Sequence, residues 1–430
     1  MLRRTACLLL ALILMLAGLG AFAAAEGQTT ITILTRWSGS DPMASYLENF
    51  IKEFEAANPD VKVENISVNE EASYNNKFKT LVATGDIPNI FYLPGIASLV
   101  KYAENGLIMD VSELFSDKEW YDGFVDGAFD MFNFEPYGIK GVYAIPFAVT
   151  PEVIFYNVDM LKSIGYETFP ETMDDFYAMM DKLVAKGVAP FAPGAKETWR
   201  TGHFHNQFLY HWCGVPKAMD LGARKAKWTD PDVVQSLAYV KEMNDRGYFM
   251  ENCVGLTYDM EKQLFFSQQS AMVNNGSWFI GDVLGAGDLP FTVGVAKFPY
   301  FADKPELKDH IISYPQNYVL KGGMDEKEKD ATIRFIKAYT SKENQTRVVV
   351  EKGTLPIRKD IDYTGIEVSD LFRQCMDIVS AAVAQGGDSF DYDQLSSMQD
   401  VTRNAIVGML LGNSPEQAAQ EIQAEIDANG

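Results

Sequence analysis

The sequence lacks several features that would point to catalysis or to a membrane-spanning fold. It has only 4 cysteines in 430 residues and no CxxC pair, so neither a zinc ribbon nor a thioredoxin-like centre is indicated. No GxGxxG follows the first expected strand and no GxSxG occurs, which argues against a dinucleotide site and a serine-hydrolase nucleophile. After residue 25, no stretch is long and apolar enough to span a bilayer.

The N-terminal 25 residues have the pattern of a secretory signal peptide. A short basic region with Arg3 and Arg4 precedes an apolar run and the small residues AFAAA. A membrane anchor is the alternative, but an uninterrupted span needs about 20 apolar residues, and two glycines interrupt this one. We therefore expect cleavage near Ala23 or Ala25 and export of the mature chain.

Basic residues are scarce, which limits the classes of partner. Removing Arg3 and Arg4 takes the basic count from 37 to 35 against 59 acidic residues, so the net charge falls from -22 to about -24. Such a surface repels nucleic acid and anionic lipid. With 47% hydrophobic and 12% aromatic residues the chain is globular, and about 400 mature residues favour two domains.

Three cysteines remain after cleavage of the signal peptide, Cys213, Cys253 and Cys375, so either one pair forms a disulfide or all three thiols are free.

The first part of the mature chain alternates strand and helix patterns. Expected strands at Thr29–Leu34, Val61–Val68 and Asn89–Leu93 alternate with expected helices at Ser45–Ala57 and Glu71–Thr84. This order predicts an α/β domain with parallel strand pairing. Further helices are expected at Asp174–Lys186, with Thr172 in a capping box, at 327–352, and after Ser414-Pro415.

Three of the four histidines, His203, His205 and His211, lie in TGHFHNQFLYHW. On a helix they share no common face. A His-x-His strand can hold zinc, but no nearby cluster supplies the remaining ligands, so we expect partly buried polar contacts and no metal or other cofactor.

Acidic residues are too numerous to carry a signal, whereas three tryptophans stand out. Trp37, Trp199 and Trp278 each lie beside Gly, Ser, Thr or Arg and outside an amphipathic period. Each ring is either a cap on a hydrophobic layer or a stacking surface. Together they favour stacking against a flat hydroxylated ligand with apolar faces.

Several stretches, in order, resemble a known family. They are TLVATGDIPNIFYLPG, GVYAIPFAVTPEVIFYNVDMLKSIG, PETMDDF, SAMVNNGSW, GVAKFP, FIKAYTSKENQ, GTLPIRKD and LLGNSPEQAAQEIQAEI. The set resembles the extracellular solute-binding proteins of ABC importers, in the carbohydrate-binding group that includes maltose-binding protein. The resemblance covers nearly all of the mature chain.

The resemblance implies a ligand cleft between two lobes and a set of residues that face it. Trp278 would be a platform for a sugar ring, and Gly276 would let the chain turn the indole into the cleft. The residues implied to bind substrate are Trp37, Ser38, Asp41, Leu93, Pro94, Gly95, Thr150, Trp199, Asn275, Gly276 and Trp278. The Leu93–Gly95 loop lacks the acid and arginine of some maltodextrin binders, which argues against maltose. AFAAAEG has no lipobox cysteine, so a periplasmic or freely secreted protein is expected.

These observations predict an α/β, two-lobed, periplasmic-binding-protein-like fold, each lobe a mostly parallel sheet flanked by helices. We expect residues 26–142 with 296–345 in the first lobe and 143–295 with 346–430 in the second. The expected function is capture of a sugar or oligosaccharide by a monomer and its delivery to the transmembrane subunits of an ABC permease, with no enzymatic activity. A secreted glycan-acting enzyme and a surface glycan-binding adhesin are the alternatives.

Overall fold

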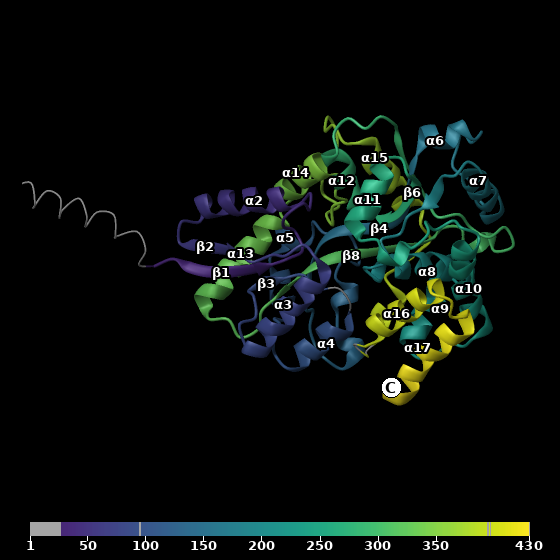
Figure 1. The fold of residues 1–430 in the computed structure, drawn as a ribbon. Helices are drawn as coiled ribbons and strands as arrows, with labels where there is room; N and C mark the ends of the chain where they lie inside the picture. Colours follow the sequence, from purple (N-terminus) through teal and green to yellow (C-terminus); the bar gives the residue numbers. More distant parts are fainter. Residues whose placement is uncertain (1–26, 94–95, 394, 396, 430) are drawn as a thin grey trace, which may run out of the picture.

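The computed structural model describes residues 27–93, 96–393, 395 and 397–429, and the predicted signal peptide lies outside them. The chain folds into two lobes, with β1–β3 on the left of Figure 1 and α7–α10 with α16 and α17 on the right. One mixed sheet runs through both, in the order β2-β1-β3-β8-β4-β6-β5, with β7 beside β4 and β9 beside β8. Among the described residues, no helix has both the length and the apolar character needed to cross a membrane.

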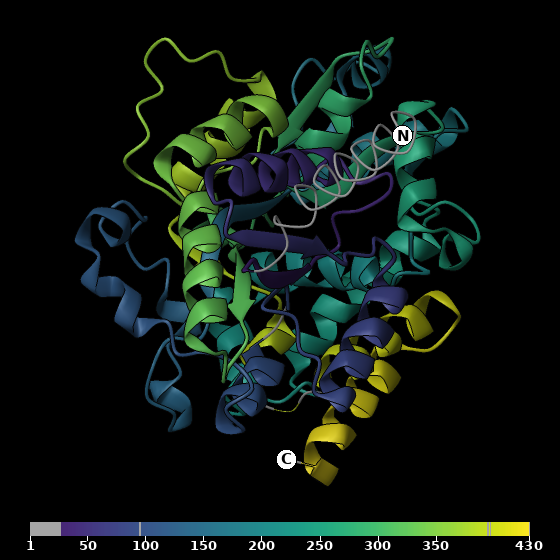
Figure 2. The same cartoon turned by 90° about the vertical axis from the view of Figure 1, so that its left-hand side faces the viewer.

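The first lobe is built on the strands that the sequence indicates most clearly. Strand β1 pairs in parallel with both β2 and β3, as expected. Figure 2 looks onto this lobe, with β1 across the middle of the view and α2 above it. Its elements are β1 (Thr29–Leu34), α2 (Ala44–Ala57), β2 (Val61–Asn65), α3 (Glu71–Thr84), β3 (Ile90–Phe91), α4 (Ile96–Glu104), α5 (Lys118–Tyr121) and α13 (Glu326–Tyr339), with short 3₁₀ turns at Ser112–Ser116, Asp130–Phe132 and Glu135–Tyr137.

Local signals explain why these elements begin and end where they do. The β-branched run TTITIL forms β1, and its Ile31 and Ile33 are fully buried. Glu70 caps α3 by accepting from two backbone N–H groups, and Gly85 ends the helix with a φ of 81°.

The prediction of a single helix over 327–352 is wrong, because the segment forms two helices. Helix α13 ends at Tyr339, and α14 (Lys342–Lys352) begins after a new cap, because Ser341 Oγ accepts from the backbone N–H of Asn344 at 3.2 Å. Thr340 at the break accepts a hydrogen bond from Trp120 Nε1 at 2.9 Å. The strand predicted at Val61–Val68 also ends earlier, at Asn65.

The second lobe contains more antiparallel pairing than the first. Strands β6 and β7 both run antiparallel to β4, and only β5 with β6 and β9 with β8 are parallel. Its elements are α6 (Val158–Ser163), α7 (Met173–Ala185), β5 (Ala189–Phe191), α8 (Trp199–Trp212), α9 (Val215–Gly222), α10 (Pro231–Asp245), α11 (Tyr258–Phe266), β6 (Ser270–Gly276), α12 (Phe279–Gly285), β7 (Val293–Ala296), α15 (Asp370–Ala381), β9 (Ala384–Gly386), α16 (Met398–Leu410) and α17 (Pro415–Asn429), with 3₁₀ turns at Cys253–Gly255, Pro305–Leu307 and Ser389–Tyr392.

Two long strands belong to both lobes. Strand β4 (Ile145–Asn157) and strand β8 (His310–Leu320) pair antiparallel from Ile145 opposite Tyr318 to Pro151 opposite Ser313. The start of β4, from Ile145 to Ala148, and the end of β8, from Tyr318, pack into the first-lobe core. Beyond Pro151, β4 packs into two second-lobe cores on opposite faces of the sheet, with Ile154 in one core and Val153 and Phe155 in the other. The predicted lobe boundaries at 142/143, 295/296 and 345/346 stay predictions.

Candidate ligand-binding cleft

A cleft with about 1900 Å³ of empty space, including the open solvent at its mouth, is lined by residues of both lobes. The first lobe contributes the loop after β1, Tyr92 after β3, and part of β4. The second contributes the beginning of α8, the beginning of α11, the turn before α12, and Arg403 of α16. The paired strands β4 and β8 pass beneath it, with Thr150 and residues 314–318 in the lining.

The three tryptophans singled out by the sequence all line this cleft. Trp37 comes from the first lobe, where its ring packs at 5.3 Å from Phe147 and 6.1 Å from Tyr339. Trp199 and Trp278 come from the second lobe, with ring centroids 6.1 Å apart and an edge-to-face arrangement. Aromatic surfaces from both lobes therefore face one space.

Contacts on several sides fix the orientation of Trp278. Its Nε1 donates to the Tyr258 hydroxyl at 3.0 Å, and that hydroxyl also accepts from Asn275 Nδ2 at 2.9 Å. The indole covers Gly276 so closely that a Cβ at position 276 would overlap its six-membered ring. Gly276 is thus required for the close approach of the ring, whereas the sequence interpretation gave it the role of a turn.

The structure brings some of the predicted binding residues together in the lining of the cleft, whereas others lie outside that lining. Trp37, Asp41, Thr150, Trp199 and Trp278 line the cleft. Four others do not: Ser38, Leu93, Asn275 and Gly276. Asn275 is fully buried and supports Tyr258, and the Leu93 carbonyl accepts from Asn317 at 3.4 Å. Pro94 and Gly95 lie outside the described residues.

A group of charges lies where the two lobes face each other near Asp41. Lys262 Nζ lies 2.9 Å from Asp259 and 3.0 Å from Asp282, so this cation is neutralised within the second lobe. Burial raises the pKa of Asp41 to about 6, and the nearby Asp282 charge adds to the rise, although the Met43 N–H bond opposes it. Burial also raises the pKa of Asp282.

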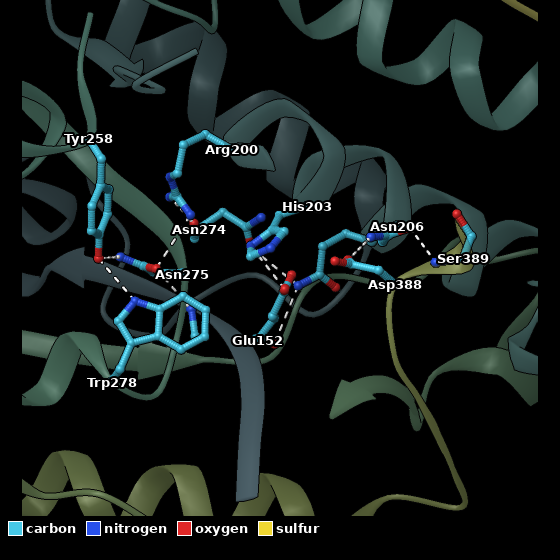
Figure 3. A network of polar contacts seen from close by, with 12 residues as sticks. Glu152, Arg200, His203, Asn206, Tyr258, Asn274, Asn275, Trp278, Asp388 and Ser389 are labelled. Carbon is cyan, nitrogen blue, oxygen red and sulfur yellow. Dashed lines mark hydrogen bonds and ion pairs between the residues drawn. The ribbon is translucent and has the colours of Figure 1, made fainter. Parts of the chain in front are cut away.

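Helix α8 carries the three clustered histidines, and each contacts a different partner. His203 Nδ1 lies 2.9 Å from Glu152 Oε1, His205 Nε2 lies 3.1 Å from Ser236 Oγ, and His211 Nδ1 lies 2.8 Å from the Gln207 carbonyl. They share no face, as expected. The premise that no other ligands lie near them is wrong, because Glu152 and Asp388 lie beside His203. Figure 3 shows Glu152 and His203 facing each other, with Asn206 and Asp388 next to them.

Burial governs the protonation of this group. It raises the pKa of Glu152 to about 8, against the lowering effect of Arg200 and Arg403. It lowers the pKa of His203 to about 3. The pKa of Asp388 is raised, again mainly by burial. At neutral pH these values favour a neutral imidazole beside a protonated Glu152.

Two arginines near this group already have carboxylate partners. Arg200 is fully buried and paired with both oxygens of Glu261 at 2.7 Å, and it also donates to the Asn274 carbonyl. Arg403 lies between the lobes, 3.6 Å from Glu71 of α3 and 3.7 Å from Asp388. Arg403 is thus the cation that links the two lobes at this end of the cleft.

Sequence reasoning missed several cleft residues for an identifiable reason. They come from α3, α8, α11, α16 and the segment around the 3₁₀ turn Ser389–Tyr392, and apart from His203 in its histidine cluster neither periodicity nor spacing marks them. These residues are Tyr258, His203, Asp388, Asp391, Arg403 and Glu71. Arg200 is fully buried and paired with Glu261, but helix α8 also carries three histidines, an asparagine and a glutamine, so the sequence pattern does not single Arg200 out.

Comparison with known proteins gives a consistent family assignment. Residues 49–370 match the family model described as bacterial extracellular solute-binding protein. The multiple sugar-binding protein of Streptococcus mutans is 25% identical over 266 residues, which are 60% of this chain and 60% of that protein, less than two thirds of its length. The sn-glycerol-3-phosphate-binding periplasmic protein of Escherichia coli is 25% identical over 364 residues, 80% of this chain and 77% of that protein.

A solved structure supports the fold. The structure titled chitin oligosaccharide binding protein superimposes with a TM-score of 0.85 at 23% identity, covering 93% of this chain and 98% of that one. At this identity the likeness establishes the two-lobed architecture. It does not transfer the ligand.

Proposed function

The chain belongs to the bacterial extracellular solute-binding protein family, and from that premise we propose that it captures a sugar or oligosaccharide between its two lobes and delivers it to the transmembrane subunits of an ABC permease. The observation that carries the proposal is the convergence of Trp37, Trp199 and Trp278, from both lobes, on one cleft. Sugar rings present apolar C–H faces to such aromatic surfaces and hydroxyl rims to polar groups.

Closure of the lobes supplies the signal that a permease reads. Ligand binding stabilises the closed state only by the contacts that it makes in that state and not in the open one. The paired strands β4 and β8 are the hinge in this proposal, since they are the long strands shared by the two cores. The chain acts as a monomer outside the cytoplasm, which size-exclusion chromatography of the mature protein can check.

The charge of the cleft favours an uncharged carbohydrate over a phosphate ester of the kind named for the Escherichia coli relative. Six carboxylates line the cleft against four basic side chains. Of the basic groups, Lys262 is held by two aspartates and Arg403 lies between Glu71 and Asp388. A phosphate bound by Lys262 or Arg403 would have to displace these carboxylates, which costs more than hydrogen bonding of neutral hydroxyls.

A ligand screen tests the proposal directly. Mature protein is melted with a panel of monosaccharides and oligosaccharides, with glycerol 3-phosphate included as the anionic comparison. A true ligand at 100 times its dissociation constant stabilises the fold by about 2.7 kcal/mol, which is visible as a shift in melting temperature. Stabilisation by glycerol 3-phosphate alone, with no response to any sugar, would contradict the proposal.

Two further assays separate the proposal from the enzyme and adhesin alternatives. Incubation of the best-binding sugar with the protein should return the sugar unchanged, since the relatives of the chain are binding proteins. Release of new reducing ends would support a glycan-acting enzyme instead. The loaded protein should stimulate the ATPase of a cognate permease in vesicles. Sugar binding without any stimulation would favour an adhesin.

A further inference from the structure

The group formed by Glu152, His203 and Asp388 has the composition and closeness of a metal site. One ligand atom from each residue can be chosen so that all three lie within 4.8 Å of one another. The residues come from three separate elements, strand β4, helix α8 and the segment before the 3₁₀ turn Ser389–Tyr392. All three side chains are buried, so water competes little for their donor atoms.

Within the described part of the chain, the two carboxylate oxygens of Glu152 and Nδ1 of His203 have no hydrogen-bond partner, whereas Asp388 Oδ1 accepts from Asn206 Nδ2 and Asp388 Oδ2 lies 3.7 Å from Arg403. Glu152 Oε1 lies 2.9 Å from His203 Nδ1, but the contact lacks hydrogen-bond alignment. Neither carboxylate oxygen of Glu152 has a hydrogen-bond partner among the described residues. A fully buried carboxyl group without partners is costly, because it has lost its hydration and gained nothing in return. The geometry therefore leaves the Glu152 oxygens and His203 Nδ1 available to an external ligand, and Asp388 would join them by sharing its contacts with Asn206 and Arg403.

The local charge balance also favours a cation. Arg200, which is fully buried, is already paired with Glu261 through both carboxylate oxygens. Arg403 is shared between Asp388 and Glu71, and the half-buried Asp391 also lines the cleft. Carboxyl groups thus outnumber the cations that remain free to pair with them, and a divalent ion that displaced the proton of Glu152 would be balanced by the carboxylate it creates.

The donor set suits a transition metal. One imidazole nitrogen and two carboxylate oxygens match the ligands that bind zinc where a coordination position is left for water or substrate. His203 and Asp388 line the cleft, so further coordination positions would face the cleft space.

We propose that Glu152, His203 and Asp388 form a binding site for a divalent transition metal, with Zn²⁺ as the probe ion, at the polar end of the cleft. The site would hold water, or a hydroxyl group of the bound solute, on its open side. It replaces our sequence-based expectation that no metal is bound, which assumed that no ligands lie near the histidines.

The experiment measures metal binding without any solute, so its outcome is independent of the proposed transport function. Mature protein is stripped with a chelator, returned to chelator-free buffer and titrated with Zn²⁺ by calorimetry. One saturable site per chain is expected. Glu152→Gln and Asp388→Asn should each lower the affinity at least tenfold, because even the groups that only support a ligand are worth about 10–100-fold.

Two controls identify the site as the source of the signal. His310→Gln removes the histidine that lies outside helix α8 and should change Zn²⁺ affinity less than threefold. Co²⁺ should give ligand-field absorption bands that Glu152→Gln abolishes, which reports coordination itself. Thermal melts confirm that each variant is folded, and if Glu152→Gln fails to fold then Asp388→Asn decides. Absence of stoichiometric binding by the unaltered protein, or binding untouched by the folded variants, would overturn the proposal.

Discussion

Replacing Trp278 by alanine is expected to weaken solute binding by about 2 kcal/mol, roughly 30-fold. A sugar that covers roughly 50 Å² of the indole face removes that area from water for about 1.2 kcal/mol, and the aromatic interaction adds about 0.5–1.5 kcal/mol. Stability should fall by about 2 kcal/mol, less than the 3–5 kcal/mol typical of a fully buried ring, because Trp278 is only half-buried. The Tyr258 hydroxyl keeps its bond from Asn275, so no buried group is orphaned.

Denaturant melts and calorimetric titration with the best sugar from the screen measure the two quantities separately. Trp212→Ala is the matched control: its ring is also half-buried, it packs at 5.3 Å from Tyr239 and 5.0 Å from Phe301, and it does not line the cleft. It should lose comparable stability and keep its affinity. If Trp278→Ala loses stability but binds sugar as tightly as the control does, the stacking role is refuted.

Three further predictions follow from the geometry and charge of the molecule. Gly276→Ala should lower sugar affinity nearly as much as Trp278→Ala, because a Cβ must displace the indole; titration with unchanged affinity would contradict the close packing. The pKa of Asp41 is raised to about 6 in the folded chain, so the native state binds the carboxyl proton more tightly than the unfolded state does. The stability contributed by this protonation is present at low pH and is lost as the pH rises toward and through 6. Asp41→Asn should therefore raise the melting temperature more at pH 8 than at pH 5, and equal shifts would show that the carboxyl is not desolvated. Burial raises the pKa of the three free thiols, Cys213, Cys253 and Cys375, to about 11–12. Alkylation at pH 8 should therefore be slow in the native state and fast after unfolding. Because the thiols are free, added reductant should leave the melting temperature unchanged.

Elements with strong local signals could be predicted from the sequence nearly to the residue. Helix α3 matches its predicted bounds because a cap at Glu70 and a glycine at 85 mark its ends. The break at Ser341 was missed although the apolar period stops at Tyr339, because the polar residues 340–347 contain no proline or glycine and only the Ser341 cap marks the start of a new helix. The prediction that the three tryptophans face one cleft rested on the family resemblance. The Glu152, His203 and Asp388 group was not predictable, since only the folded sheet and helix α8 bring these distant positions together.

The way the first lobe is assembled has a consequence for export. Strand β3 lies between β1 (Thr29–Leu34), made near the start of the chain, and β8 (His310–Leu320), which begins 281 residues after β1 does, and the same core needs Phe335 and Val348. During synthesis the early strands therefore wait for most of the chain before they can complete their sheet, because long-range pairing cannot form until both partners exist. A polypeptide that must thread through a translocation channel before folding gains from this delay. In this chain the order of the segments leaves the first-lobe sheet without β8 until the last third has been made.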